Sequence, residues 1–320
     1  MRIRSAVAAA LLITVTASTA ACGGATSDAG EAEPTAAKGT VNIAINPWVG
    51  YEANAAVVAY LLEKKLGYTV DKKELKEEIA WQGFETGEVD VVLENWGHDD
   101  LKKTYIEDKK TAVEVGPTGN KGVIGWYVPQ WMADEYPDIT DGKNLNKYAD
   151  LFKTSESKGK GQLLDGDPSF VTNDEALVSN LKLNYTVVFS GSEAAIIKAA
   201  QQATAQKKPL LFYFYEPQWL FAKEKYARIK LPPYTAGCDA DPKKVACDYP
   251  DYVLDKIASK KFADANSTAY QLIKNFQWTN EDQNLVSDYL TNQGMSADQA
   301  AEKWVNEHES TWKPWIPAGS

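Results

Sequence analysis

Aromatic side chains follow several predicted strands of this sequence, close to the points where those strands end. Trp48 and Trp96 lie in the first positions past two predicted strands, Tyr215 closes a third, and Phe170 lies shortly after a fourth. Trp126, inside another apolar run, is a further candidate. Each π face is worth roughly 0.5–2 kcal/mol to a fully methylated nitrogen, which has no N–H to donate. The pattern predicts an aromatic cage for a quaternary ammonium compound; the alternative for each ring is packing in the core or between lobes.

The elements that must position these rings alternate between strands and helices. Such alternation is typical of an α/β fold with parallel sheets, and two series in one chain predict two lobes. Ligands of open α/β sheets bind beyond the carboxyl ends of the strands, which is where the rings fall. Ser192 is expected to cap one helix, and the chain beyond Pro217 is expected to be mostly helical. Strands are predicted at residues 41–45, 90–93, 121–128, 162–164, 186–189 and 209–215.

Length and charge narrow the possible partners. The chain has 320 residues, enough for one large domain or two medium ones. Its formal net charge is −10, and losing Arg2 and Arg4 with the first 22 residues would make it −12. An acidic surface repels phosphate backbones, so no nucleic acid partner is expected.

The first residues resemble an export signal. Arg2 and Arg4 precede a short, Ala-rich apolar stretch, and residues 19–22 resemble a bacterial lipoprotein cleavage box that ends in Cys22. We therefore expect a signal peptide at 1–22, a lipid on Cys22, a flexible tether at 23–39 and a location on the outer face of the cytoplasmic membrane. The alternative is ordinary secretory cleavage beside an incidental cysteine.

Two further cysteines, Cys238 and Cys247, flank a turn-rich segment. If Cys22 carries lipid, these two remain as a pair in an exported protein, where disulfides persist. We expect a disulfide between them; the alternative is two free thiols.

Signals for enzymatic chemistry are scarce. The sequence has two histidines, His98 and His308, far apart, and it has neither a Gly-x-Ser-x-Gly elbow nor a phosphate-binding glycine loop. No cofactor, metal site or catalytic residue is expected, which disfavours an extracellular hydrolase. An amino-acid binder would usually use an arginine for the carboxylate, and past the signal segment only Arg228 remains. A sugar-binding protein, which also uses Trp rings, is the strongest rival.

The order and spacing of several segments resemble the glycine betaine, choline and proline betaine-binding proteins of ABC importers. The segments are residues 47–50, 87–96, 125–129 and 208–217, together with Cys238 and Cys247. The resemblance implies a two-lobe type II binding-protein fold that closes on its ligand. Lobe I would comprise residues 40–127 plus 215–320, and lobe II residues 128–214. A monomer that delivers its ligand to a permease and ATPase complex is expected.

The resemblance also implies roles for single residues. Trp48 and Trp96 would be walls from the first lobe, and Tyr215 falls where many members carry Trp. Members that bind betaines hold the carboxylate on backbone N–H groups of a turn before a helix, a turn that residues 167–173 match loosely. The further candidates are Val171, Thr172 and Asn173 for the anion, His98 as a polar contact, and Glu52 and Glu94 as possible counter-charges or as solvated or hinge-bonded carboxylates. Betaine and choline both remain open as ligands.

Overall fold

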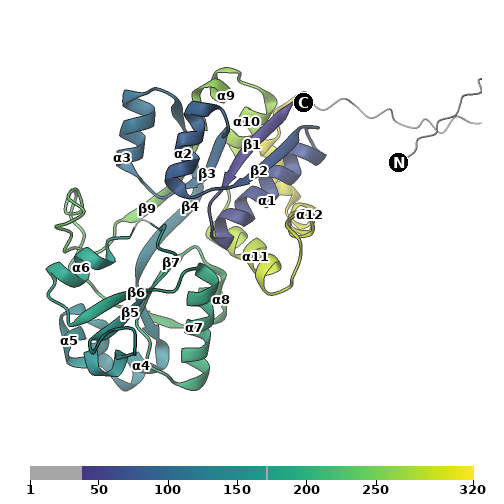
Figure 1. Ribbon diagram of the computed structural model, residues 1–320. Coiled ribbons are helices and arrows are strands. Elements are labelled where there is room, and N and C mark those ends of the chain that lie inside the picture. The colour runs from purple at the N-terminus through teal and green to yellow at the C-terminus, as the bar shows by residue number, and fades with distance from the viewer. Residues whose placement is uncertain (1–37, 171) are drawn as a thin grey trace, which may run out of the picture. The chain divides into compact units, whose positions relative to one another are not determined.

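The computed structural model describes residues 38–170 and 172–320, and Figure 1 labels most of its helices and strands. Nine strands form a sheet in the order β2-β1-β3-β9-β4-β7-β5-β6, with β8 paired to β4. The strands are β1 (Thr40–Ile45), β2 (Thr69–Glu74), β3 (Val91–Asn95), β4 (Ala112–Pro129), β5 (Gly161–Asp165), β6 (Tyr185–Phe189), β7 (Phe212–Glu216), β8 (Tyr226–Arg228) and β9 (Asp251–Ser259).

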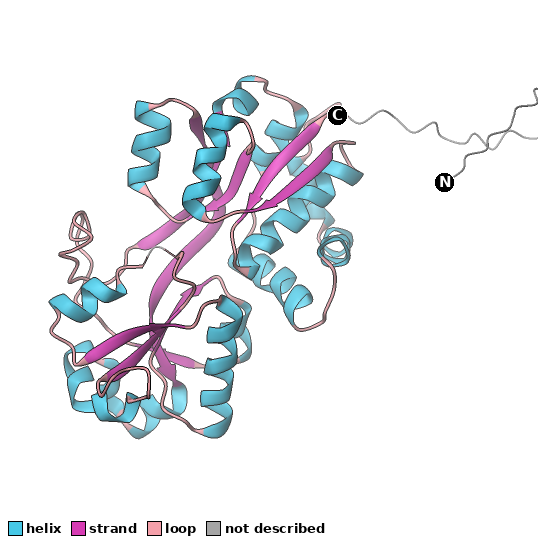
Figure 2. Ribbon diagram, viewed as in Figure 1, coloured by secondary structure: helices cyan, strands magenta, loops and turns pink. Residues whose placement is uncertain are grey.

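Helices surround two groups of strands, which the long strand β4 joins (Figure 2). The longer helices are α1 (Val49–Lys64), α2 (Glu77–Thr86), α6 (Asp174–Asn180), α7 (Glu193–Gln206), α10 (Thr268–Asn275), α11 (Asn280–Thr291) and α12 (Ala297–Glu307). The shorter ones are α3 (Asp99–Lys102), α4 (Gln130–Glu135), α5 (Leu145–Tyr148), α8 (Trp219–Lys223), α9 (Lys260–Asp264) and α13 (Glu309–Trp312). Single turns of π or 3-10 helix are η1 (Lys103–Asp108), η2 (Pro137–Thr140), η3 (Gly142–Asn144), η4 (Ala149–Phe152) and η5 (Lys313–Trp315).

Helix α1 is buried on most of its surface. Its apolar side chains include Tyr51, Val57 and Leu61, all fully buried, because α11 and α12 pack on the side that faces away from the sheet. A helix that is apolar on nearly every side is typical of such a central position. The start of α1, which carries Trp48 just before it, is therefore firmly placed.

The expected α/β class is confirmed, but the sheet is mixed rather than parallel. Strand β1 runs parallel to β2 and β3, and β5 runs parallel to β6 and β7, as the strand–helix alternation predicts. In the centre, β9 is antiparallel to both β3 and β4, and β7 is antiparallel to β4. Strand β9 follows a loop, residues 229–250, that contains no helix, so the rule of strand–helix alternation does not reach it.

The expectation that the chain beyond Pro217 is mostly helical is wrong in one important place. Residues Asp251–Ser259 form β9, which lies between β3 and β4 in the sheet. Strand β2 and the first half of β4 were also not predicted. The expected cap of α7 is confirmed, because the Ser192 hydroxyl accepts a hydrogen bond from the backbone N–H of Ala195 at 3.2 Å.

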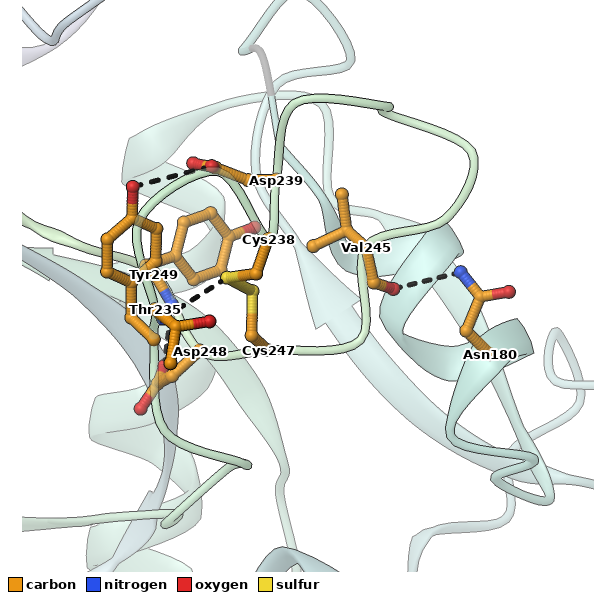
Figure 3. Close-up of a disulfide and its surroundings, with 9 residues drawn as sticks. Asn180, Thr235, Cys238, Asp239, Val245, Cys247, Asp248 and Tyr249 are labelled. Carbon is orange, nitrogen blue, oxygen red and sulfur yellow. Dashed lines mark hydrogen bonds between the residues drawn. A yellow bond between two sulfur atoms is a disulfide. The ribbon is translucent and has the colours of Figure 1, made fainter.

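The predicted disulfide is confirmed: Cys238 and Cys247 are bonded within the loop that connects β8 to β9. Figure 3 shows this loop beside α6, where the Asn180 amide donates a hydrogen bond to the Val245 carbonyl at 2.9 Å. The bridge therefore constrains a segment that packs on the helix following β5.

The N-terminal predictions lie outside the described residues. These are the signal peptide, the lipid on Cys22 and all but the last two residues of the tether. Within the described part of the chain, no helix combines the length and the apolar character that crossing a bilayer requires.

Candidate ligand-binding site

Four of the predicted rings meet in one pocket. Trp48 stands at the start of α1, Trp96 directly follows β3, Phe170 lies between β5 and α6, and Tyr215 is on β7. We call this the aromatic pocket, and its lining residues are Trp48, Glu77, Trp96, His98, Ile124, Phe170, Tyr213, Tyr215 and Tyr252.

The rings of the aromatic pocket stand steeply to one another. Trp48 and Phe170 have centroids 5.7 Å apart and planes at 87°. Phe170 and Tyr215 are 6.5 Å apart at 83°, and Tyr215 and Trp96 are 5.6 Å apart at 78°. Tyr252 adds a further wall, 5.6 Å from Trp96 at 62°. Rings inclined in this way enclose a compact group, whereas a sugar ring stacks on a flat platform.

One buried carboxylate holds two of the walls from behind. Glu94 Oε1 accepts hydrogen bonds from the indole N–H groups of Trp48 at 2.8 Å and Trp96 at 2.9 Å. Its Oε2 accepts from the side-chain amides of Asn54 at 2.5 Å and Gln283 at 2.9 Å. Burial raises the pKa of Glu94, and the four hydrogen bonds oppose that rise. Both indoles are thereby fixed in orientation.

A second buried carboxylate holds Tyr215. The Tyr215 hydroxyl donates to Glu193, the first residue of α7. Glu193 also accepts from the Gln218 amide at 2.5 Å and from the backbone N–H of Val49 at 2.9 Å. Burial raises the pKa of Glu193 to about 7, against these hydrogen bonds. This side chain connects the wall on β7 with the start of α1.

His98 reaches the pocket as part of an ion pair. Its Nε2 lies 2.9 Å from Glu77 Oε1, and both side chains are about nine-tenths buried. Burial lowers the pKa of His98, but the hydrogen bond and the charge of Glu77 raise it by more, so the net shift is upward. The pair therefore presents little net charge to the pocket.

The remaining predicted residues lie elsewhere. Trp126 is fully buried outside the pocket, and its indole N–H donates to Asp174 Oδ1 at 2.7 Å. Glu52 is exposed and lines a neighbouring groove. The Thr172 hydroxyl bonds Asp165 at 3.1 Å, and the Asn173 N–H bonds the Tyr249 hydroxyl at 2.7 Å. Val171 lies outside the described residues.

Four lining residues were not predicted. Tyr213 shares the β7 face with Tyr215, two positions away, and strand alternation could have identified it. Tyr252 belongs to β9, within the segment expected to be helical. Ile124 and Glu77, on β4 and α2, carry no signal that separates them from other residues of those elements.

Comparison with known proteins identifies the family. Residues 39–307 match the model of the substrate-binding domain of the ABC-type glycine betaine transport system. The chain belongs to this family. As a member of the ABC-type glycine betaine substrate-binding family, it is a solute-binding component of an ABC importer, and members of the family are extracytoplasmic and are not enzymes.

Three proteins of known ligand that resemble this chain share less than a quarter of its sequence. The trimethylamine N-oxide-binding protein of Pelagibacter ubique (strain HTCC1062) is 24% identical over 288 residues, 87% of this chain and 91% of the relative. Lactococcal OpuAC in its closed form with glycine betaine has a TM-score of 0.69 and 22% identity, covering 88% of this chain and 100% of that one. A choline-binding protein in complex with choline has the same TM-score and 19% identity, covering 86% and 91%. The two structures share the two-lobe type II fold, which confirms the fold prediction.

Proposed function

We propose that this protein captures a compact quaternary ammonium compound in the aromatic pocket and delivers it to the permease and ATPase of its importer. The enclosure formed by Trp48, Phe170, Tyr215 and Trp96 carries the proposal, because steeply inclined π faces surround a methylated nitrogen from several sides. The relatives named for trimethylamine N-oxide, glycine betaine and choline all take ligands with such a nitrogen.

The roles within the pocket follow from its contacts. Trp48, Trp96, Tyr215 and Phe170 would contact the methyl groups, and the pair of His98 with Glu77 would face the polar end of the ligand. We propose that lobe I comprises residues 40–127 plus 215–320 and lobe II residues 128–214, as the sequence predicts. Ligand binding would close one lobe on the other.

A calorimetric titration tests the ligand class. The purified protein is titrated with choline, glycine betaine, proline betaine, carnitine and trimethylamine N-oxide, and separately with a panel of mono- and disaccharides. We expect saturable binding to at least one methylated ammonium compound and a change in Trp fluorescence on binding, because indoles line the pocket. Binding of sugars alone would support the rival function, and turnover of a choline ester would support a hydrolase.

We also propose that the protein works as a monomer anchored by a lipid on Cys22. The signal-like residues 1–22 support the anchor. Metabolic labelling with a radioactive fatty acid should mark the unaltered protein and leave a Cys22→Ala variant unlabelled. Equal labelling of both would place the lipid elsewhere.

A further inference from the structure

Glu94 accepts four hydrogen bonds, which favour its ionised form against the effect of burial. The two indole N–H groups that bond its Oε1 can only donate. The Asn54 amide N–H₂ bonds both Glu94 Oε2 and the Gly50 carbonyl, at 3.0 Å for the latter, so this amide also acts as a donor. A protonated carboxyl would direct its own hydrogen at a donor. The side chain is 1% exposed, so the negative charge is shielded from solvent.

This charge lies behind the rings instead of among the groups that line the pocket. Trp48 and Trp96 separate Glu94 from the ligand space, and each holds the carboxylate with its N–H edge while lining the pocket. A methylated cation in the pocket would therefore be attracted both by the π faces and by a fixed negative charge beyond them. A carboxylate on the ligand would be repelled by the same charge, and this repulsion would be weakly screened because the site is buried.

Part of the turn where a ligand carboxylate was expected is already engaged in hydrogen bonds within the protein. The N–H of Asn173 bonds the Tyr249 hydroxyl, which in turn donates to Asp174 at 2.8 Å. The Thr172 hydroxyl bonds Asp165. Asp165 and Asp174 are both fully buried beside this turn, so the turn carries acidic groups where an anion would need donors.

Among the residues that line the aromatic pocket, no lysine or arginine offsets these carboxyls. His98 is the basic lining residue, and it is paired with Glu77. Arg228 is not among the lining residues; its guanidinium bonds Asp248 at 3.2 Å and the backbone carbonyl of Ile124 at 2.9 Å. The ion pairs that usually hold a ligand carboxylate are therefore missing from this lining.

We propose that Glu94 acts as a buried counter-ion that makes the pocket select methylated ammonium ligands with a net positive charge over zwitterions that carry a carboxylate. This inference rests on the proposed function. Glu94 would act on the choice between the two ligand classes through Trp48 and Trp96, without touching the ligand itself. Choline is the probe for the favoured class and glycine betaine the probe for the disfavoured class.

The test compares both probes on the unaltered protein and on two variants by calorimetry. Glu94→Gln keeps an oxygen that can accept both indole bonds but removes the charge. Glu88→Gln is the matched control, because Glu88 is exposed and lies six positions earlier in the same segment. We expect choline to bind the unaltered protein at least tenfold more tightly than glycine betaine. Glu94→Gln should weaken choline at least tenfold and change glycine betaine less than threefold, while Glu88→Gln leaves both affinities unchanged.

Several results would overturn the inference. Glycine betaine binding the unaltered protein as tightly as choline would contradict it and leave the proposed function intact, as would an equal loss for both probes in Glu94→Gln. Binding of no methylated ammonium compound would contradict the proposed function itself. Circular dichroism and thermal melting establish whether Glu94→Gln is folded. If it is not folded, the ratio of the choline and glycine betaine affinities of the unaltered protein still tests the proposed selectivity.

Discussion

Two carboxylates give the aromatic pocket its geometry without lining the ligand space around the ring faces. Glu94 bonds the indoles of Trp48 and Trp96, and Glu193 bonds the hydroxyl of Tyr215. Since each ring is fixed by a hydrogen bond at its edge, its face is already oriented before a ligand arrives. Less conformational entropy is then lost on binding, which favours affinity for a small ligand.

The ring faces themselves should carry much of the affinity. We expect Trp48→Ala and Trp96→Ala each to weaken binding of a methylated ammonium compound by about 1–3 kcal/mol, through lost apolar burial and lost cation–π attraction. Trp304→Ala is the control, because Trp304 is fully buried, is not among the residues that line the pocket and stacks on His308 with ring centroids 4.9 Å apart. Titration calorimetry measures the affinities. A loss for Trp304→Ala as large as for the other two would mean that the site is misplaced.

At the scale of the elements, local patterning predicted the buried strands and missed those defined by distant partners. Strand β1 carries apolar side chains at alternate positions and β3 begins with three apolar residues, so their positions and the rings after them could be predicted. Strand β9 carries Asp251, Asp255 and Lys256, and it becomes a central strand only because β3 and β4 enclose it. Tyr252 could not be placed in the pocket without that pairing.

The disulfide loop before β9 offers a test at this scale. Replacing both Cys238 and Cys247 by Ser should lower the free energy of unfolding by about 2–3 kcal/mol, because the bridge closes a loop of nine-residue separation in the unfolded chain. Urea denaturation measures the change. A reducing agent should reproduce the loss in the unaltered protein and have no further effect on the double variant. Equal stability of all samples would mean that the loop contributes nothing through its bridge.

At the scale of the whole molecule, the site depends on contacts between the two predicted lobes. Phe170 and Glu193 come from the segment predicted for lobe II, whereas Trp48 and Val49 come from lobe I. The sequence could identify Trp48, Trp96, Tyr215 and Phe170 as candidates from strand ends. It could not identify Glu193, because the hydrogen bond from Val49 joins residues 144 positions apart and exists only once the lobes meet.

Glu193 should therefore make the stability of the folded protein depend on pH. Its pKa rises from 4.5 to about 7 on burial, so between these values the folded state binds a proton that the unfolded state has released. The contribution of Glu193 is fully present below pH 4.5, decreases as the pH rises towards 7 and is constant above that. A shift of this size corresponds to about 3 kcal/mol.

Denaturant unfolding of the unaltered protein and of Glu193→Gln, from pH 4.5 to 8, isolates this contribution. Gln cannot ionise but can still accept from Val49 and donate to Tyr215, so the variant should lack the decrease attributable to residue 193. The difference in unfolding free energy between the two proteins should change steadily with pH up to about 7 and then level off. Other groups with shifted pKa values, such as Asp165 and Lys256, are common to both proteins, so their effects cancel in this difference. A difference in unfolding free energy that does not vary with pH would show that Glu193 is already ionised throughout this range in the folded protein. The contact with Val49 would then join the two lobes through a carboxylate whose pKa is not raised by burial.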